Sequence, residues 1–261
     1  SMIDLHPAQD PETVQGLLEL VHRFETLLRA ISGFDAFSFQ GGAGQPGIFT
    51  SALVIRAFHE ANGDLDRKRE IITTSYSHPA NAAAAAVAGF HVISLLPGER
   101  GYPDLDAFRA ALSDRTAGLM ITNPEDTGIF NPHIGEFVRL VHERGGLAAY
   151  DQANGNPLLG VARARDQGFD LGQFNLHKTF GAPHNATGPG AAAVGVRADL
   201  ARFLPAPVVA RQGDRYVLDH DRTDSVGRVR SWAGNLQVVA RAYPWVMALG
   251  AGGLRTVAET A

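Results

Sequence analysis

The feature that most constrains the fold is an alternation of short apolar runs with segments of helical spacing between residues 70 and 196. The apolar runs lie at residues 71–74, 91–96, 118–122, 147–151, 169–175 and 191–196. Between them the sequence predicts helices at 81–88 and 104–112, and a third that begins at Asn131-Pro132 and ends at Gly145-Gly146. This alternation is typical of βα units, whose parallel strands are covered by helices. We therefore expect an α/β fold: a mostly parallel central sheet with helices on both faces.

Further helices are predicted on either side of this region. Asp10 as N-cap and Pro11 as first helical residue predict an N-terminal helix over about 11–32, which Gly33 ends. A second helix is predicted at 47–61, after a glycine-rich loop at 41–44, and a last one at 235–249 with a kink at Pro244. A short strand is expected at 216–219. With neither an internal repeat nor a linker, residues 1–261 are expected to form a single domain.

Composition excludes several classes of function. The 261 residues include no cysteine, which rules out cysteine nucleophiles and thiolate metal sites, and the ten histidines show no close metal-ligand pair. We therefore expect no metal. The net charge of −4, without a basic cluster, gives no basis for nucleic-acid binding. No apolar run is long enough to span a membrane and the first residues do not resemble a signal peptide, so a cytoplasmic protein is expected.

Polar residues follow four of the predicted strands, where ligands bind in such sheets. They are His78, Asn123, Asp151 and Lys178. A lysine and an upstream aspartate at one sheet edge suggest pyridoxal phosphate, which needs an amine for its Schiff base and an anion opposite its pyridine nitrogen. The glycine-rich loop at 41–47, running into a helix, supplies a site for the phosphate group through free backbone N–H groups.

Several segments also carry a family resemblance, in order and over nearly the whole chain. They are Leu5-His6-Pro7, Phe39-Gln40 with Ala43-Gly44 and Gly47, Ala88-Gly89-Phe90, Ile121-Thr122-Asn123-Pro124, Tyr150-Asp151 through Asn156, Asn175-Leu176-His177-Lys178-Thr179-Phe180, Pro183-His184 with Gly188-Pro189-Gly190, and Ser225-Val226-Gly227-Arg228-Val229-Arg230-Ser231. The set resembles the glycine decarboxylase family, the P-protein of the glycine cleavage system, in its second-subunit half.

The resemblance implies an aspartate-aminotransferase-like (fold type I) large domain that binds pyridoxal phosphate. It implies that Lys178 binds the cofactor aldehyde, Asp151 faces its pyridine nitrogen, His78 stacks on its ring, and Asn123 lies near the ring hydroxyl. Further cofactor contacts are expected from Ala43, Gly44, Gln45, Ala153, His177 and Thr179. For Asn123, a purely structural turn is the alternative.

The resemblance also implies a reaction and partners. Members of the family decarboxylate glycine and pass its aminomethyl group to a lipoylated carrier protein. A small amino acid, glycine favoured, is therefore the expected substrate. The expected assembly is a homodimer or a hetero-oligomer with a companion subunit.

The sequence departs from the family pattern at several points. The run that is usually His-Gly-Thr-Asn-Pro-Ala-Ser reads His78-Pro79-Ala80-Asn81-Ala82-Ala83-Ala84, and the glycines usual after Pro183-His184 are replaced at 185–187. The family's C-terminal small domain is expected to be absent. These differences leave two alternatives open: an enzyme for another small amino acid in a specialised pathway, or a non-catalytic subunit that needs a partner chain.

Two other motifs allow different interpretations. Gly42-x-Gly44-x-x-Gly47 matches the dinucleotide-binding fingerprint, but the next predicted strand ends in Thr73-Thr74-Ser75 and not in the acidic residue that holds a ribose. We therefore disfavour a nucleotide site. Arg228 and Arg230 are candidates for binding a phosphate or carboxylate, or for facing a partner subunit. An exposed pair of arginines is the alternative.

Overall fold

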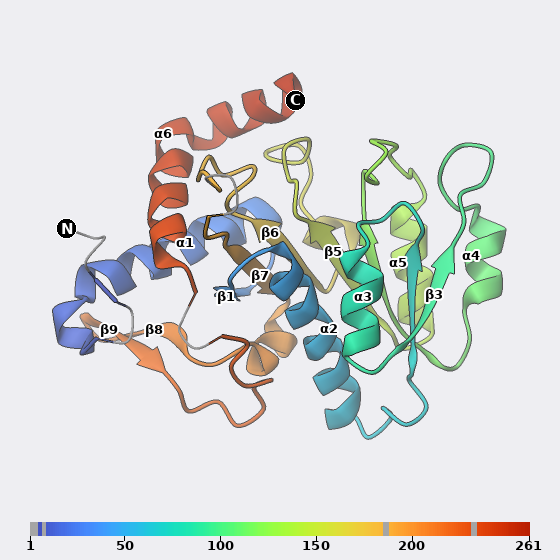
Figure 1. The fold of residues 1–261 in the computed structure, drawn as a ribbon, viewed down its shortest axis with the longest axis horizontal. Helices are drawn as coiled ribbons and strands as arrows, with labels where there is room; N and C mark the ends of the chain where they lie inside the picture. Colours follow the sequence, from blue (N-terminus) through green and yellow to red (C-terminus); the bar gives the residue numbers. More distant parts are fainter. Residues whose placement is uncertain (1–4, 7–8, 185–187, 231–233) are drawn as a thin grey trace.

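The computed structural model describes residues 5–6, 9–184, 188–230 and 234–261. Its central sheet has the strand order β1-β7-β6-β5-β4-β2-β3 (Figure 1). The strands are β1 Ala36–Gly41, β2 Glu70–Thr74, β3 His91–Leu95, β4 Thr116–Thr122, β5 Leu147–Gln152, β6 Leu171–Asn175 and β7 Ala192–Val196. Pro7, residues 185–187 and Ser231, which the sequence analysis singled out, lie outside the described residues.

The sheet is mostly parallel, as predicted. Strands β2 to β6 run parallel to one another. Strand β7 is antiparallel to β6, and β1 is antiparallel to β7. Strand β1 was not predicted, because its six residues lie directly between a helix and the glycine-rich loop. Five of the six are buried, so β1 is nevertheless an integral edge of the sheet.

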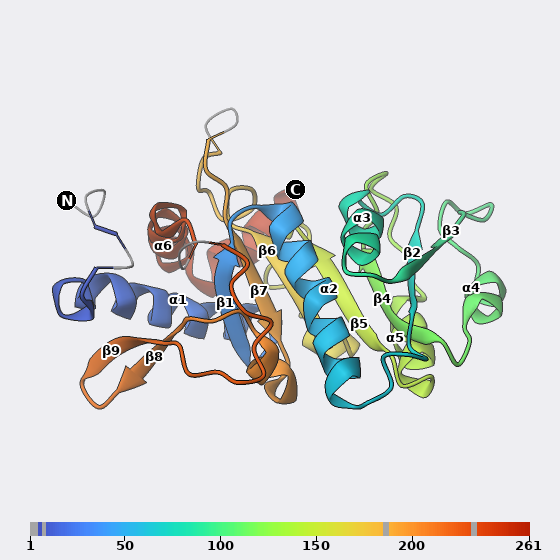
Figure 2. The ribbon, with the colours of Figure 1, turned by 60° about the horizontal axis from the view of Figure 1, so that its bottom comes forward.

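Helices cover both faces of the sheet, which confirms the predicted layers (Figure 2). Alternate strand residues enter two separate apolar cores: Ile71 packs in the core beneath α2 and α3, and Ile72 in the core that contains Phe108 and Phe137 of α4 and α5. Helix α1 lies on the second side and packs against α6. The helices are α1 Gln15–Ser32, α2 Gly44–Ala61, α3 Ala80–Val87, α4 Leu105–Ala111, α5 Ile134–Glu143 and α6 Leu236–Thr260.

Three helix boundaries differ from the prediction. The N-terminal segment begins as a separate 3-10 turn at Pro11–Thr13, and α1 follows only after Val14, whose φ of −126° is not helical. Helix α2 begins at Gly44, three residues before the predicted start. Helix α6 continues to Thr260, and its backbone leaves helical geometry at Gly250 (φ 59°, ψ −174°), not at Pro244. Glycine lacks a Cβ and tolerates this conformation, which explains the position of the bend.

A hairpin lies beside the N-terminal helix. Its strands are β8 Val208–Gln212 and β9 Arg215–Asp219, so the strand expected at 216–219 is present and has a partner that was not predicted. The Gln15 amide of α1 joins the hairpin, because it donates to the Tyr216 carbonyl (2.7 Å) and accepts from the Tyr216 N–H (2.9 Å). Among the residues that the structure describes, no helix combines the length and apolarity needed to cross a bilayer.

Candidate cofactor site

The carboxyl ends of neighbouring strands place the predicted residues along one edge of the sheet. Asp151 of β5 pairs in register with Thr122 of β4 on one side and with Gln173 of β6 on the other. His78 follows β2, and Lys178 follows β6 in the next turn. The topology therefore brings residues that are far apart in sequence to one edge.

Asp151 is the best-anchored polar group at this edge. It is only 4% exposed, and its two carboxylate oxygens accept four hydrogen bonds. Oδ1 accepts from Gln173 Nε2 (2.7 Å) and the Ala153 N–H (3.0 Å), and Oδ2 accepts from Asn81 Nδ2 (3.0 Å) and Thr122 Oγ1 (3.4 Å). A buried carboxylate needs such partners, because desolvation without them is costly.

Three of these donors were not predicted as site residues: Asn81, Thr122 and Gln173. Asn81 lies in the first turn of α3, three residues after His78. That nearness to a predicted site residue is the signal that could have identified it. Gln173 is a polar residue in the middle of a fully buried strand. A polar side chain at such a position requires a partner, and this is the signal that could have identified it.

Lys178 lies in a turn whose flanks are firmly anchored. Leu176 and Phe180 are completely buried, whereas the Lys178 side chain is exposed. The Lys178 N–H donates to the Asn175 carbonyl (3.2 Å), and its own carbonyl accepts from the Gly181 N–H (3.3 Å). The lysine is thus exposed on a backbone that its neighbours hold in place.

The chain contains only one other lysine, Lys68. Lys68 precedes β2 at the amino end of the sheet, opposite the candidate site. Its side chain is 4% exposed and its Nζ donates to the Arg144 carbonyl after α5. Lys178 is therefore the only lysine at the edge where Asp151 lies.

His78 lines a cavity of about 260 Å³ together with residues at and after the end of β2, among them Thr74 and Ser77. The ring is exposed, and its Nδ1 accepts a hydrogen bond from the Ala80 N–H (3.2 Å). The His78 backbone N–H donates to Thr122 Oγ1 (3.4 Å). These contacts fix the turn that carries the imidazole to the end of β4 and the start of α3.

Asn123 has a structural role in this structure. Its amide is buried and bonded on both sides to the backbone of Asn131, as acceptor from the N–H (2.8 Å) and donor to the carbonyl (3.2 Å). The Tyr150 hydroxyl donates to the Asn123 carbonyl, and burial raises the pKa of that hydroxyl. A contact between Asn123 and a cofactor ring stays a prediction.

His177 and Thr179 connect the lysine turn to the neighbouring backbone. His177 Nδ1 lies 3.1 Å from both the N–H and the carbonyl of Ala191, and burial lowers the pKa of this imidazole. Thr179 Oγ1 accepts from the Gly155 N–H (2.9 Å), which ties the turn to the loop that follows Asp151. Both residues hold the lysine turn in place, and their direct contact with a cofactor stays a prediction.

The glycine-rich loop fits a phosphate group. Ala43 caps α2 without any side-chain hydrogen bond, so the first N–H groups of the helix keep their capacity to bind an anion. A Cβ at Gly44 would lie 2.6 Å from Asn175 Nδ2, and one at Gly47 would lie 2.8 Å from the Ala192 Cβ. Glycine is therefore required for the loop to approach the ends of β6 and β7 this closely. With Lys178 and Asp151, the edge offers what pyridoxal phosphate requires: an amine, a carboxylate and an anion site.

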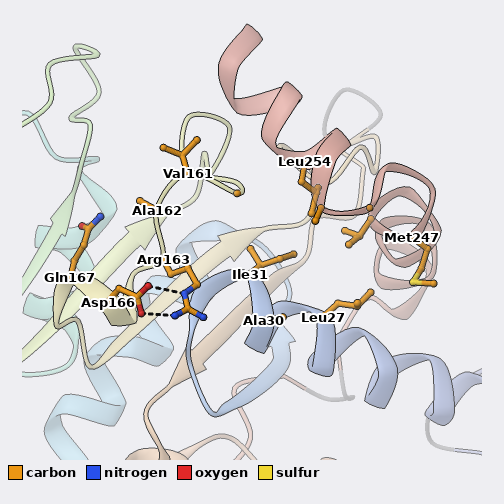
Figure 3. Close-up of a pocket in the computed structure, with 14 residues that line it drawn as sticks. Leu27, Ala30, Ile31, Val161, Ala162, Arg163, Asp166, Gln167, Met247 and Leu254 are labelled. Atoms are coloured by element: carbon orange, nitrogen blue, oxygen red, sulfur yellow. Dashed lines mark hydrogen bonds and ion pairs between the residues drawn. The ribbon is translucent and has the colours of Figure 1, made fainter.

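A larger cavity lies elsewhere, between α1, α6 and residues 160–167 (Figure 3). It has a volume of about 790 Å³ and a largely apolar lining that includes Leu27, Ile31 and Met247. At one side, the Arg163 guanidinium pairs with the Asp166 carboxylate (2.8 Å). None of the predicted site residues lines this groove, so its size does not make it the candidate site.

A comparison with protein families matches more than half of the chain. The family model for class-V aminotransferases matches residues 47–208, which include His78, Asp151 and Lys178. The chain belongs to the class-V aminotransferase family. Members of this family depend on pyridoxal phosphate, which confirms the predicted cofactor.

Curated proteins that are similar to this chain carry a more specific name than the family does. A protein of Caldanaerobacter subterraneus, named probable glycine dehydrogenase (decarboxylating) subunit 2, is 47% identical over 99% of this chain and 53% of its own length. A protein of the same name from Pyrococcus abyssi is 45% identical over 98% of this chain and 51% of its own. These relatives confirm the resemblance noted in the sequence. The chain spans about half the length of the curated relatives it matches.

Solved structures confirm the predicted fold class. A glycine decarboxylase (P-protein) of the glycine cleavage system, in inhibitor-bound form, has a TM-score of 0.81 at 17% identity, covering 97% of this chain and 58% of the other. A cysteine desulfurase from Escherichia coli has a TM-score of 0.65 at 17% identity, covering 96% and 62%. The fold is therefore that of the fold type I enzymes.

Proposed function

We propose that this chain decarboxylates glycine with the help of pyridoxal phosphate and passes the aminomethyl group to a lipoylated carrier protein. The observation that carries the proposal is the arrangement of Asp151 and Lys178 at the carboxyl ends of the adjacent strands β5 and β6, with the carboxylate buried and held by four hydrogen bonds. The names of the relatives, glycine dehydrogenase (decarboxylating) subunit 2, support glycine as the substrate.

In this proposal the amine of Lys178 holds the cofactor, and the carboxylate of Asp151 faces its pyridine nitrogen. When bound, the cofactor supplies a sink for the electron pair that remains when carbon dioxide leaves. The loop at residues 43–45 binds the phosphate group through backbone N–H groups at the start of α2.

Asp151 contributes a negative charge whose position does not change during the reaction. Because Gln173, Asn81, Thr122 and the Ala153 backbone all donate to it, the carboxylate cannot rotate away from the ring nitrogen. A charge that is already oriented in a buried site stabilises a developing positive charge without reorganisation. The four donors thus fix the position of a carboxylate that would favour a protonated ring nitrogen.

His78 limits the access of water to the reacting carbon. Its Nδ1 is bonded to the Ala80 N–H, so the flat face of the imidazole is available to cover the ring of the cofactor. Excluding water slows unwanted protonation at that carbon.

The chain's two lysines make the proposal directly testable. Protein loaded with pyridoxal phosphate is expected to show the visible absorption band of a lysine-bound cofactor, and Lys178→Ala should remove it. Reduction with borohydride followed by peptide mapping should find the label on Lys178 and not on Lys68. A label on Lys68, or no band in the unmutated protein, would refute the assignment. Release of labelled carbon dioxide from carboxyl-labelled glycine then tests the substrate.

We also propose that the chain works with a companion subunit. The relatives are named as second subunits, and this chain spans about half their length. Full turnover is therefore expected only when a first subunit and a lipoylated carrier are supplied. Equal activity without the first subunit would contradict this part of the proposal.

Another small amino acid is an alternative substrate. The observation that favours it is the loss of the family's glycine and threonine after His78, where this chain has Pro79 and Ala80. A panel of small amino acids, scored for carbon dioxide release and for amino-group transfer, distinguishes the two: glycine should give the highest rate. A higher rate with another amino acid would favour this alternative.

A further inference from the structure

Arg230 lies against the glycine-rich loop that precedes α2. A Cβ built on Gly42 would be 1.4 Å from Arg230 Nη1 and 2.3 Å from its Cζ. Any side chain at position 42 would thus overlap the guanidinium group. The absence of a side chain at Gly42 is what lets this arginine lie directly on the loop.

The backbone that carries Arg230 is anchored beside β1. The Val229 N–H donates to Gln40 Oε1 (3.4 Å), and the buried Gln40 amide in turn donates to the Pro207 carbonyl (3.2 Å). Farther back, the Ser225 hydroxyl donates to the Leu204 carbonyl (2.7 Å). Figure 2 shows this segment, after β9, passing in front of β1. The segment at residues 225–230, which holds the guanidinium beside the loop, is therefore fixed by hydrogen bonds.

A second polar group reaches the same loop from the sheet. The Asn175 side chain at the end of β6 is 4% exposed, and its Oδ1 has no hydrogen-bond partner among the described residues. Its Nδ2 lies 2.6 Å from where a Cβ of Gly44 would be. The Nδ2 group is a hydrogen-bond donor, which is what a phosphate oxygen accepts from, so this end of the amide can bind an anion beside the loop. The loop is therefore bordered by an arginine at Gly42 and an amide at Gly44.

We propose that Arg230 binds the phosphate group of pyridoxal phosphate, together with Asn175 and the first N–H groups of α2. The inference rests on the proposed cofactor site but not on glycine as the substrate. A guanidinium presents several N–H donors in one plane and pairs with two phosphate oxygens at once. The loop at 42–45 is where the helix terminus already favours an anion. Arg230 thus adds a full positive charge to a site that otherwise consists of neutral donors.

The test compares pyridoxal phosphate with pyridoxal, which has the same ring and aldehyde but no phosphate. In the full chain, Arg230→Ala should weaken the affinity for pyridoxal phosphate by about ten- to a hundredfold. It should leave the affinity for pyridoxal unchanged, because pyridoxal lacks the phosphate that the guanidinium binds. Arg228→Ala is the matched control, since Arg228 is exposed on the same segment, and it should change neither affinity.

Two further variants separate charge from position. Arg230→Lys keeps the charge but not the planar pair of donors, so it should fall between the wild type and Arg230→Ala. Gly42→Ala leaves Arg230 in the chain but takes the place of its guanidinium, so it should weaken pyridoxal phosphate binding in the same direction.

Two outcomes would overturn the inference. Equal weakening of pyridoxal and pyridoxal phosphate by Arg230→Ala would indicate a structural role. Unchanged affinity for pyridoxal phosphate with a raised KM for the amino acid would assign Arg230 to the substrate carboxylate instead. The comparison of the affinities for pyridoxal and pyridoxal phosphate is independent of whether glycine is the substrate, because these binding measurements need no turnover.

Discussion

The site depends on one carboxylate and on the amides around it. Asp151 and Lys178 could be predicted because each follows a recognisable apolar strand, and strand ends are where ligands bind in such sheets. The amides of Asn81 and Gln173 could not be predicted in the same way. Gln173 stands out as a polar residue in a buried strand, but a single sequence does not show that its partner, and that of Asn81, is Asp151.

Replacing Asp151 by asparagine should separate charge from shape. The asparagine keeps the size of the side chain but removes the negative charge that we propose faces the ring nitrogen. We expect turnover to fall by at least about 100-fold, the scale on which a single oriented electrostatic group contributes to catalysis. Cofactor occupancy, measured from the visible absorption band, should fall much less. Turnover close to the wild-type rate would refute the proposed role of Asp151.

His177 should give the protein a measurable dependence of stability on pH. Burial is the main cause that lowers its pKa below the ordinary value of 6.5, and the nearby charges of His184 and Lys178 act in the same direction. As the pH falls below about 6.5, the unfolded chain takes up a proton that the folded protein does not. The free energy of unfolding should therefore decrease as the pH falls through this window.

His177→Gln is the variant that tests this dependence. Urea unfolding at several pH values between 7.5 and 5 should show a smaller slope for the variant than for the wild type. An identical slope would mean that another group is responsible.

At the scale of elements, predictions succeeded where the spacing of apolar residues was regular. The strands from β2 to β7 lie within a few residues of their predicted positions. Strand β1 was missed because its short sequence is followed at once by glycines, which usually indicate a loop. The bend of α6 was placed at Pro244, the residue type that most often disrupts a helix, whereas the structure bends it at Gly250.

Packing of α2 against the sheet should be sensitive to a single added methyl group. In Gly47→Ala the new Cβ would lie 2.8 Å from the Ala192 Cβ and 2.9 Å from Gln173 Oε1, so α2 would have to move away from β6 and β7. Overpacking of this kind lowers the free energy of unfolding by about 1–3 kcal/mol. Chemical denaturation measures the change.

Gly16→Ala is the control for this substitution. Gly16 is exposed in α1, with no atom within 4 Å of the added Cβ, so the change should raise stability by up to about 1 kcal/mol through helix propensity alone. Equal effects of the two substitutions would show that the close approach of α2 to the sheet does not matter for stability.

For the whole molecule, the sequence predicted the class of fold but not the order of its strands. Alternating strands and helices limit the topology to a covered, mostly parallel sheet. They do not reveal that β7 and β1 run antiparallel at one side, because the direction of a strand depends on long-range pairing. The local pattern already suggested the cofactor, and the resemblance to a family added the expected reaction, its carrier partner and a proposed role for each site residue.

Cofactor binding should stabilise the whole fold. Three strand ends and the start of α2 contribute to the site, so pyridoxal phosphate binds the folded chain and not the unfolded one. At a concentration about 100 times its Kd, a ligand adds about 2.7 kcal/mol to the free energy of unfolding. For a chain of 261 residues this corresponds to a rise in Tm of about 5–10 °C. Thermal melts with and without the cofactor measure it, and Lys178→Ala should show a much smaller rise.

The hydrogen bond between Gln173 and Asp151 joins two adjacent parallel strands at a defined register. If β6 slipped by one residue along β5, Gln173 would turn to the opposite surface and Phe174 would face the carboxylate. A chain that had paired its strands wrongly would then fail to hold the yellow chromophore. The visible absorption of a refolded sample would thus report whether β5 and β6 are paired in the correct register, before any reaction is assayed.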